Sequence, residues 1–165
     1  MKLFSKMPLM VLLGVFTLFS CSTDSFDDNV DALEISLVDT QTKAIELEIL
    51  DLINEHRLSL GLNSLEDMSI VKSVAYSHTD YMVDNDIVSH DNFYTRSDYL
   101  KSNIGAKKVS ENVAYGYGTA EGVVNAWIKS ESHKANLEGD YTNFDISAEK
   151  NADGRWYYTN IFIKK

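Results

Sequence analysis

The strongest constraint on the fold is the position of the only cysteine, Cys21, at the end of an N-terminal apolar run. Lys2 and Lys6 give the chain a positive start, and residues 7–19 are mainly apolar. Such a run is short for a membrane-spanning helix, which needs about 20 apolar residues, but it suits the core of a signal peptide. We therefore expect the folded part to begin after residue 20. Because no second cysteine follows, packing and hydrogen bonds must stabilise the fold without an internal disulfide.

The residues before Cys21 also predict how the chain is anchored. Residues 18–21, Leu-Phe-Ser-Cys, resemble a bacterial lipobox, in which residues 1–20 are cleaved and lipid is attached to the cysteine thiol. This predicts an exported protein held on the bacterial cell envelope, at the outer membrane and in contact with the bilayer through acyl chains on Cys21. Two alternatives stay open, namely an ordinary secretory signal and an uncleaved anchor.

Residues 21–40 and the overall charge limit the classes of partner that the protein can bind. Residues 22–40 hold five aspartates, one glutamate and no basic residue, which predicts a solvated acidic tether and resembles the surface-export signal of some bacterial lipoproteins. Removal of Lys2 and Lys6 with residues 1–20 takes the formal charge from −10 to −12. A surface this acidic repels phosphate backbones, so nucleic acid is excluded as a partner. The remaining length suits one domain.

Hydrophobic periodicity predicts helices in the first half of this domain. Apolar residues at helical spacing mark residues 45–60 and 65–84, and the polar segment 87–94 predicts a loop. Thr119 is a suitable N-cap for a later helix that buries Val123, Val124, Trp127 and Ile128. The other expected elements are a short helix at 97–103, a strand at 108–115, and two strands at 145–150 and 155–164 joined by a hairpin connection at 151–154. Helices followed by strands predict an α+β fold.

Four histidines are the main candidates for chemistry. His56 and His78 lie on the apolar stripes of the first two helices, which favours hydrogen-bonded core imidazoles. His90 and His133 lie in polar segments near helix ends, where a ring nitrogen is available to a cleft. We find no serine with a histidine and an acid in a recognised order, and thus no convincing nucleophile.

Several short strings, in one order along the chain, resemble the CAP superfamily of cysteine-rich secretory proteins, antigen 5 and pathogenesis-related proteins, also called SCP-like proteins. The family motif Gly-Glu-Asn-(Ile/Leu)-Ala has its counterpart in residues 110–114, SENVA. The bacterial pattern Trp-x-x-Ser-Pro-Gly-His-Arg-x-Asn-(Ile/Leu)-Leu has its counterpart in residues 127–137. The other matching strings are LINEHR at 52–57, AYSH at 75–78, SH at 89–90, VVNAW at 123–127 and YYTNIF at 157–162.

The resemblance implies a CAP-type domain at residues 41–165, an α-β-α sandwich with a small antiparallel sheet between helical layers. It also implies a cleft lined by histidine and glutamate, which map to His90 and Glu111. The family's second glutamate and second histidine would fall on Ser130 and Tyr157, so both are lost here. His133 is the natural replacement imidazole, and Glu131 lies one position from the lost carboxylate.

These residues define a candidate site. His90, Glu111 and His133 form a two-imidazole, one-carboxylate set suited to zinc or another divalent cation; the alternative is that Glu111 orients His90 without metal. The candidates for catalysis are the same three residues together with Glu131. We expect the cleft rim to include Asn112, Tyr115, Tyr117 and Tyr157.

The function most favoured by these features is a non-enzymatic module that binds an extracellular lipid, glycan or peptide. One alternative is a metal-dependent hydrolase of peptide or cell-wall substrates. Another is a structural or adhesive surface protein whose cleft is vestigial.

Overall fold

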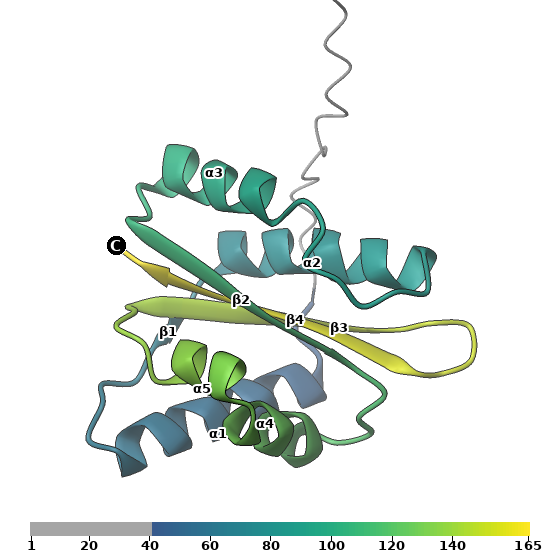
Figure 1. The fold of residues 1–165 in the computed structure, drawn as a ribbon, viewed down its shortest axis with the longest axis horizontal. Coiled ribbons are helices and arrows are strands. Elements are labelled where there is room, and N and C mark those ends of the chain that lie inside the picture. The colour runs from purple at the N-terminus through teal and green to yellow at the C-terminus, as the bar shows by residue number, and fades with distance from the viewer. Residues whose placement is uncertain (1–40) are drawn as a thin grey trace, which may run out of the picture. The chain divides into compact units, whose positions relative to one another are not determined.

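The structure, a computed structural model, describes residues 41–165, so the predicted signal peptide, Cys21 and the acidic tether lie outside the described residues. These residues form a sheet between two helical layers (Figure 1). Helices α2 and α3 cover one face of the sheet, and α1, α4 and α5 cover the other. The predicted α+β sandwich is therefore confirmed. Across the described range, no helix is both long enough and apolar enough to cross a bilayer.

The helices are α1 (Ala44–Ser59), α2 (Ser69–Asp84), α3 (Phe93–Ile104), α4 (Ala120–Lys129) and α5 (Glu131–Leu137). The Thr119 side chain caps α4 as predicted, accepting a hydrogen bond from the Gly122 N–H at 3.1 Å. Helix α3 ends at Gly105, whose φ of +70° is the left-handed conformation that glycine adopts without steric cost. This stop turns the chain into the strand that carries Glu111.

The strands are β1 (Glu66–Asp67), β2 (Lys108–Tyr115), β3 (Asn143–Lys150) and β4 (Trp156–Lys164), in the order β1-β3-β4-β2. Strands β2, β3 and β4 pair antiparallel, with Asn112 and Ile146 both opposite Asn160. The sheet is mixed and not purely antiparallel as predicted, because the short β1 pairs parallel with β3. In this strand order, β2 forms one edge of the sheet.

Alternation along the central strand β4 divides the core between the two faces. Tyr158 and Phe162 pack under α1, α4 and α5 together with the buried Trp127. Tyr157, Ile161 and Ile163 face the opposite layer. Of the two tryptophans, Trp127 is buried in the first cluster, whereas Trp156 is only partly buried against it.

Two helix starts differ by four residues from the sequence predictions, and one helix was not predicted. Helix α2 begins at Ser69 and not at Leu65, because Glu66 and Asp67 pair with β3. Helix α3 begins at Phe93, four residues before the predicted start, so the predicted loop 87–94 ends earlier. Residues 131–137 form α5, a helix that the sequence analysis did not predict.

Candidate functional site

The centre of the site is a buried ion pair between Glu111 on β2 and Arg96 on α3. Arg96 Nε donates to Glu111 Oε2 at 2.8 Å, and Arg96 Nη2 donates to Oε1 at 2.8 Å. The Arg96 side chain is 0% exposed and that of Glu111 is 1% exposed. Arg96 Nη1 also donates to the Asp91 carbonyl at 2.6 Å, which fixes the loop before α3. Both carboxylate oxygens are thus already bound by one guanidinium group.

The surroundings of Glu111 keep it ionised. Burial alone would raise the pKa of its carboxyl group, but the hydrogen bond from His90 and the charge and hydrogen bonds of Arg96 outweigh burial and lower that pKa. Glu111 is therefore a fixed carboxylate whose charge is balanced inside the protein.

The two histidines beside Glu111 have different roles. His90 Nδ1 donates to Glu111 Oε1 at 2.8 Å, while the His90 side chain remains 52% exposed. His78 is buried, its Nε2 donates to the Ser89 carbonyl at 2.7 Å, and burial lowers its pKa. His78 is therefore the core imidazole that the sequence predicted, whereas His90 presents its ring to solvent in an orientation set by Glu111. The half-buried His56 is paired with Glu138 at 3.0 Å, outside this site.

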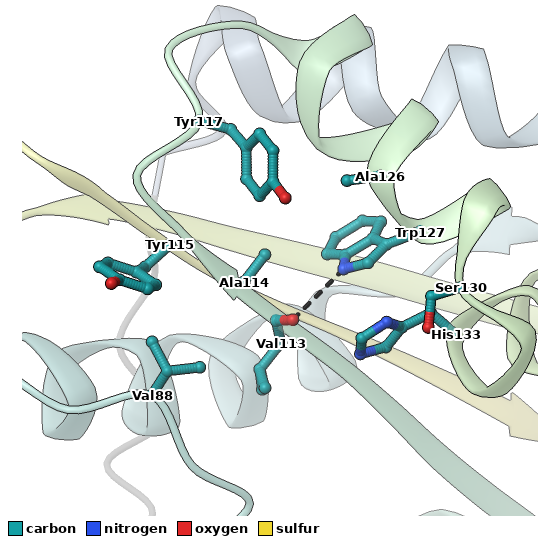
Figure 2. Close-up of a pocket in the computed structure, with 9 residues that line it drawn as sticks. All are labelled: Val88, Val113, Ala114, Tyr115, Tyr117, Ala126, Trp127, Ser130 and His133. Atoms are coloured by element: carbon teal, nitrogen blue, oxygen red, sulfur yellow. Dashed lines mark hydrogen bonds between the residues drawn. The ribbon is translucent and has the colours of Figure 1, made fainter.

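His90 and His133 line two different cavities beside β2. His90 and Glu111 line a cavity of about 290 Å³ together with Phe93, Val109, Ser110 and Asn136. His133 lines a second cavity of about 290 Å³, shown in Figure 2. Figure 2 shows the His133 ring beside Trp127 and Ser130, on the opposite side of β2 from Val88. Burial and the nearby His90 both lower the pKa of His133.

Helix α5 is positioned by two asparagines. Asn112 Nδ2 donates to the His133 carbonyl at 3.1 Å, and Asn136 Nδ2 donates to Asn112 Oδ1 at 2.9 Å. The chain leaves the helical conformation at Ser130, where ψ is 120°, and this break separates α4 from α5. The break lets His133 face the cavity, but Glu131 is exposed at the first position of α5 and lines none of the cavities described here.

The four expected rim residues separate into two groups. Tyr115 and Tyr117 are 49% and 38% exposed and line the His133 cavity. Tyr157 is buried, donates its hydroxyl hydrogen to Asp86 Oδ1 at 2.6 Å and lines a third cavity with Tyr115 and Arg155. Asn112 is 0% exposed and does not reach the rim, because its amide is bonded beneath α5.

The three-ligand metal centre does not fit this arrangement. Within residues 41–165 no group of three or more histidine, cysteine, aspartate or glutamate residues is placed to hold a metal ion. The Glu111 oxygens are bound by Arg96, and His133 faces a different cavity from His90. The geometry matches the alternative in which Glu111 orients His90, and cation binding at the two imidazoles stays a prediction.

Arg96 is the site residue that the sequence analysis did not identify. One signal was available, since Arg96 precedes Leu100 by four residues and so lies on the same buried helical face. An arginine on the buried face of a helix indicates an acidic partner from another element, because an unpaired buried charge is costly.

Residues 50–162 match the family described as the cysteine-rich secretory protein family, CAP. Since this match covers more than half of the chain, the protein belongs to the CAP family. It is 35% identical over 124 residues to the uncharacterized membrane protein YlbC of Bacillus subtilis, covering 73% of this chain and 34% of YlbC. It is 31% identical over 130 residues to the uncharacterized protein YkwD of the same organism, covering 76% of this chain and 49% of YkwD. The chain thus matches between a third and a half of the length of these relatives.

Solved structures share the fold. An outer surface protein from Borrelia burgdorferi superposes with a TM-score of 0.68 at 26% identity, covering 76% of this chain and 96% of that chain. An extracellular SCP-domain protein from Bacillus anthracis gives a TM-score of 0.63 at 29% identity, covering 73% of this chain and 40% of that one. These similarities establish a CAP domain in an extracellular-type family.

Proposed function

We propose that this protein is an exported CAP domain that captures an extracellular ligand in the cleft beside β2 without transforming it. Two solved relatives are called an outer surface protein and an extracellular protein, which supports export for this chain. Lipid attachment at Cys21 would then hold the domain on the cell envelope.

The observation that carries this proposal is the state of Glu111. A general base needs a carboxylate that can accept a proton, but both Glu111 oxygens accept hydrogen bonds from a fully buried arginine. The carboxylate instead orients His90, whose ring is half exposed at the cavity. Such a group suits recognition, since an imidazole held in one orientation donates or accepts a hydrogen bond at a fixed place.

The exposed aromatic residues support a binding role. Tyr115 and Tyr117 remain substantially exposed beside a cavity, although burying each would contribute favourable free energy. Flat rings at a cavity wall offer a large contact area with little loss of side-chain entropy on binding. Lipid, glycan and peptide ligands all fit this requirement.

The proposal is tested with one probe of each class: palmitate, a muramyl glycan fragment and a phage-displayed library of random nonapeptides. We expect one class to bind, and His90→Ala to weaken that binding at least tenfold while the variant remains folded at the assay temperature. The matched control is His56→Ala, which removes an imidazole outside the cleft and is expected to bind normally. Equal binding by the His90→Ala protein would contradict the proposal, and turnover of a bound probe would favour the hydrolase alternative.

A further inference from the structure

Strand β2 has an outer edge that pairs with no other strand in the described sheet. The Gly116 N–H donates to the Trp156 carbonyl at 2.8 Å, and successive residues of a strand direct their main-chain groups to opposite sides. The even-numbered residues of β2 therefore face β4. The outward-facing main-chain groups belong to Val109, Glu111, Val113 and Tyr115.

The carbonyl groups and the N–H groups of this edge differ in their hydrogen bonding. The Val113 carbonyl accepts a hydrogen bond from Trp127 Nε1 at 3.3 Å, and the Glu111 carbonyl accepts one from Asn136 Nδ2 at 3.3 Å. No hydrogen bond found among residues 41–165 accounts for the outward N–H groups of Glu111, Val113 and Tyr115. Glu111 and Val113 are only 5% and 7% exposed, and a buried N–H without an acceptor costs free energy. The edge is therefore rich in hydrogen-bond donors.

The cavities follow this edge in succession. The His90 cavity lies beside Val109, Ser110 and Glu111, and the His133 cavity lies beside Val113, Ala114 and Tyr115. In Figure 2, β2 runs between Val88 on one side and Trp127 and His133 on the other. Each cavity has a volume of about 290 Å³. Together they line the strand over most of its length.

Building on the ligand-binding function proposed above, we propose that the ligand is an extended peptide that adds a strand to the outer edge of β2. A strand rises about 3.4 Å per residue, so the outward N–H groups recur roughly every 6.8 Å. The carbonyl groups on alternate residues of an extended peptide recur with the same period. Acyl chains and sugars have no acceptor row with this spacing, although both fit an apolar or aromatic wall.

The charge distribution of the cleft also suits a peptide. The surface of the chain is acidic overall, but at this edge the Glu111 charge is balanced by Arg96. At Glu111 the groove thus offers donors to peptide carbonyls beside a carboxylate whose charge is already balanced. Alternate side chains of the added strand would enter the space on either side of β2, which is how strand addition combines backbone affinity with side-chain selection.

The first test changes one outward N–H. Tyr115→Pro removes that donor at the end of an edge strand, a position where proline leaves the β2–β4 ladder intact. Tyr115→Ala is the matched control, since it removes the same ring and keeps the N–H. With the best nonapeptide from the displayed library as probe, we expect Tyr115→Pro to bind about tenfold more weakly than Tyr115→Ala. Equal binding by these two variants, both folded, would overturn the inference.

The second test leaves the protein unchanged. Each residue of the same nonapeptide is N-methylated in turn, which removes one peptide donor and adds bulk at that point. We expect alternate positions to lose binding and the positions between them to tolerate the methyl group, because only every second residue faces β2. A pattern without this alternation overturns strand addition, even when Tyr115→Pro does not fold.

Failure of this inference is distinguishable from failure of the proposed function. Binding of palmitate or the muramyl fragment alone, with sensitivity to His90→Ala, overturns the peptide ligand and leaves the capture function standing. A concentration-dependent dimer that Tyr115→Pro abolishes, with no peptide captured, assigns the edge to a second copy of the chain and overturns the inference. Binding of no probe overturns both proposals.

Discussion

Arg96 and Glu111 form two parallel hydrogen bonds of 2.8 Å in the interior, between helix α3 and the edge strand β2. The pair joins the two elements on either side of the His90 cavity, and His90 depends on it for orientation. The Arg96–Glu111 pair therefore both ties α3 to the sheet and shapes the cleft.

We expect Arg96→Met to lower the free energy of unfolding by about 3–5 kcal/mol at neutral pH, because it leaves Glu111 buried without its cation. Chemical denaturation measures this loss. The matched control is the double variant Arg96→Met with Glu111→Gln, which removes both charges and should recover a large part of the stability. A double variant no more stable than the single one would show that shape, and not charge balance, determines the effect.

The same pair predicts a pH dependence. Since Glu111 has a lowered pKa in the folded protein, its contribution to stability is complete above the ordinary carboxyl pKa and is lost as the pH falls through the lowered value. In Arg96→Met the buried carboxylate has lost its cation, so its protonated form is favoured. The loss in free energy of unfolding relative to the unchanged protein should therefore be smaller under acidic conditions. Denaturation curves at pH 4 and pH 7 test this difference.

Local patterns in the sequence predicted most of the helices and strands, and the family resemblance implied their arrangement as a sandwich. The strand at 108–115 and the Thr119 cap have local signals, namely alternation and a hydroxyl before a helix. Strand β1 has no such signal, because two residues define no period and only pairing with β3 makes them a strand. Helix α5 also has no local signal, because its seven residues bury only Leu137 and so form no apolar stripe.

The candidate site was predictable only in part. The motif resemblance brought His90 and Glu111 together, and the structure places His90 Nδ1 2.8 Å from Glu111 Oε1. It did not indicate Arg96, whose partner lies 15 residues further along the chain on another element. Nor did it indicate which cavity each imidazole faces, because that depends on the backbone break at Ser130.

Asp145 on β3 gives a second pH-dependent prediction. Burial raises its pKa to about 6, against the hydrogen bonds from Ile146 and Met68 and the charge of Lys72, which favour the ionised form. A raised carboxyl pKa means that its contribution to stability is complete below the ordinary value and is lost as the pH rises through about 6. The loss amounts to about 3 kcal/mol at 1.36 kcal/mol per pKa unit.

We therefore expect the free energy of unfolding of the unchanged protein to fall between pH 4 and pH 7. Asp145→Asn should remove this fall. Asp98→Asn, which changes an exposed carboxyl group, is the control and should keep the fall. An Asp145 carboxyl carbon that titrates near pH 4 by NMR would contradict this prediction.

Anchoring at Cys21 is tested in cells. We expect the precursor to incorporate palmitate and to accumulate when globomycin blocks lipoprotein signal cleavage. Cys21→Ala should lose the label and leave the membrane fraction, because a single apolar run of this length does not span a bilayer stably. A Cys21→Ala protein that stays in the membrane would support the uncleaved anchor instead.

Zinc distinguishes the two roles open to Glu111. If the carboxylate orients His90, crystals grown with zinc should show no anomalous peak within about 2.2 Å of its oxygens, the distance of a zinc–carboxylate bond. Any peak should lie against His90 or His133, and Glu111→Gln should leave its position unchanged. A peak on Glu111 with Arg96 displaced would restore the carboxylate as a ligand. Displacement of a fully buried guanidinium group is costly, so zinc should in that case raise the melting temperature more in Arg96→Met than in the unchanged protein.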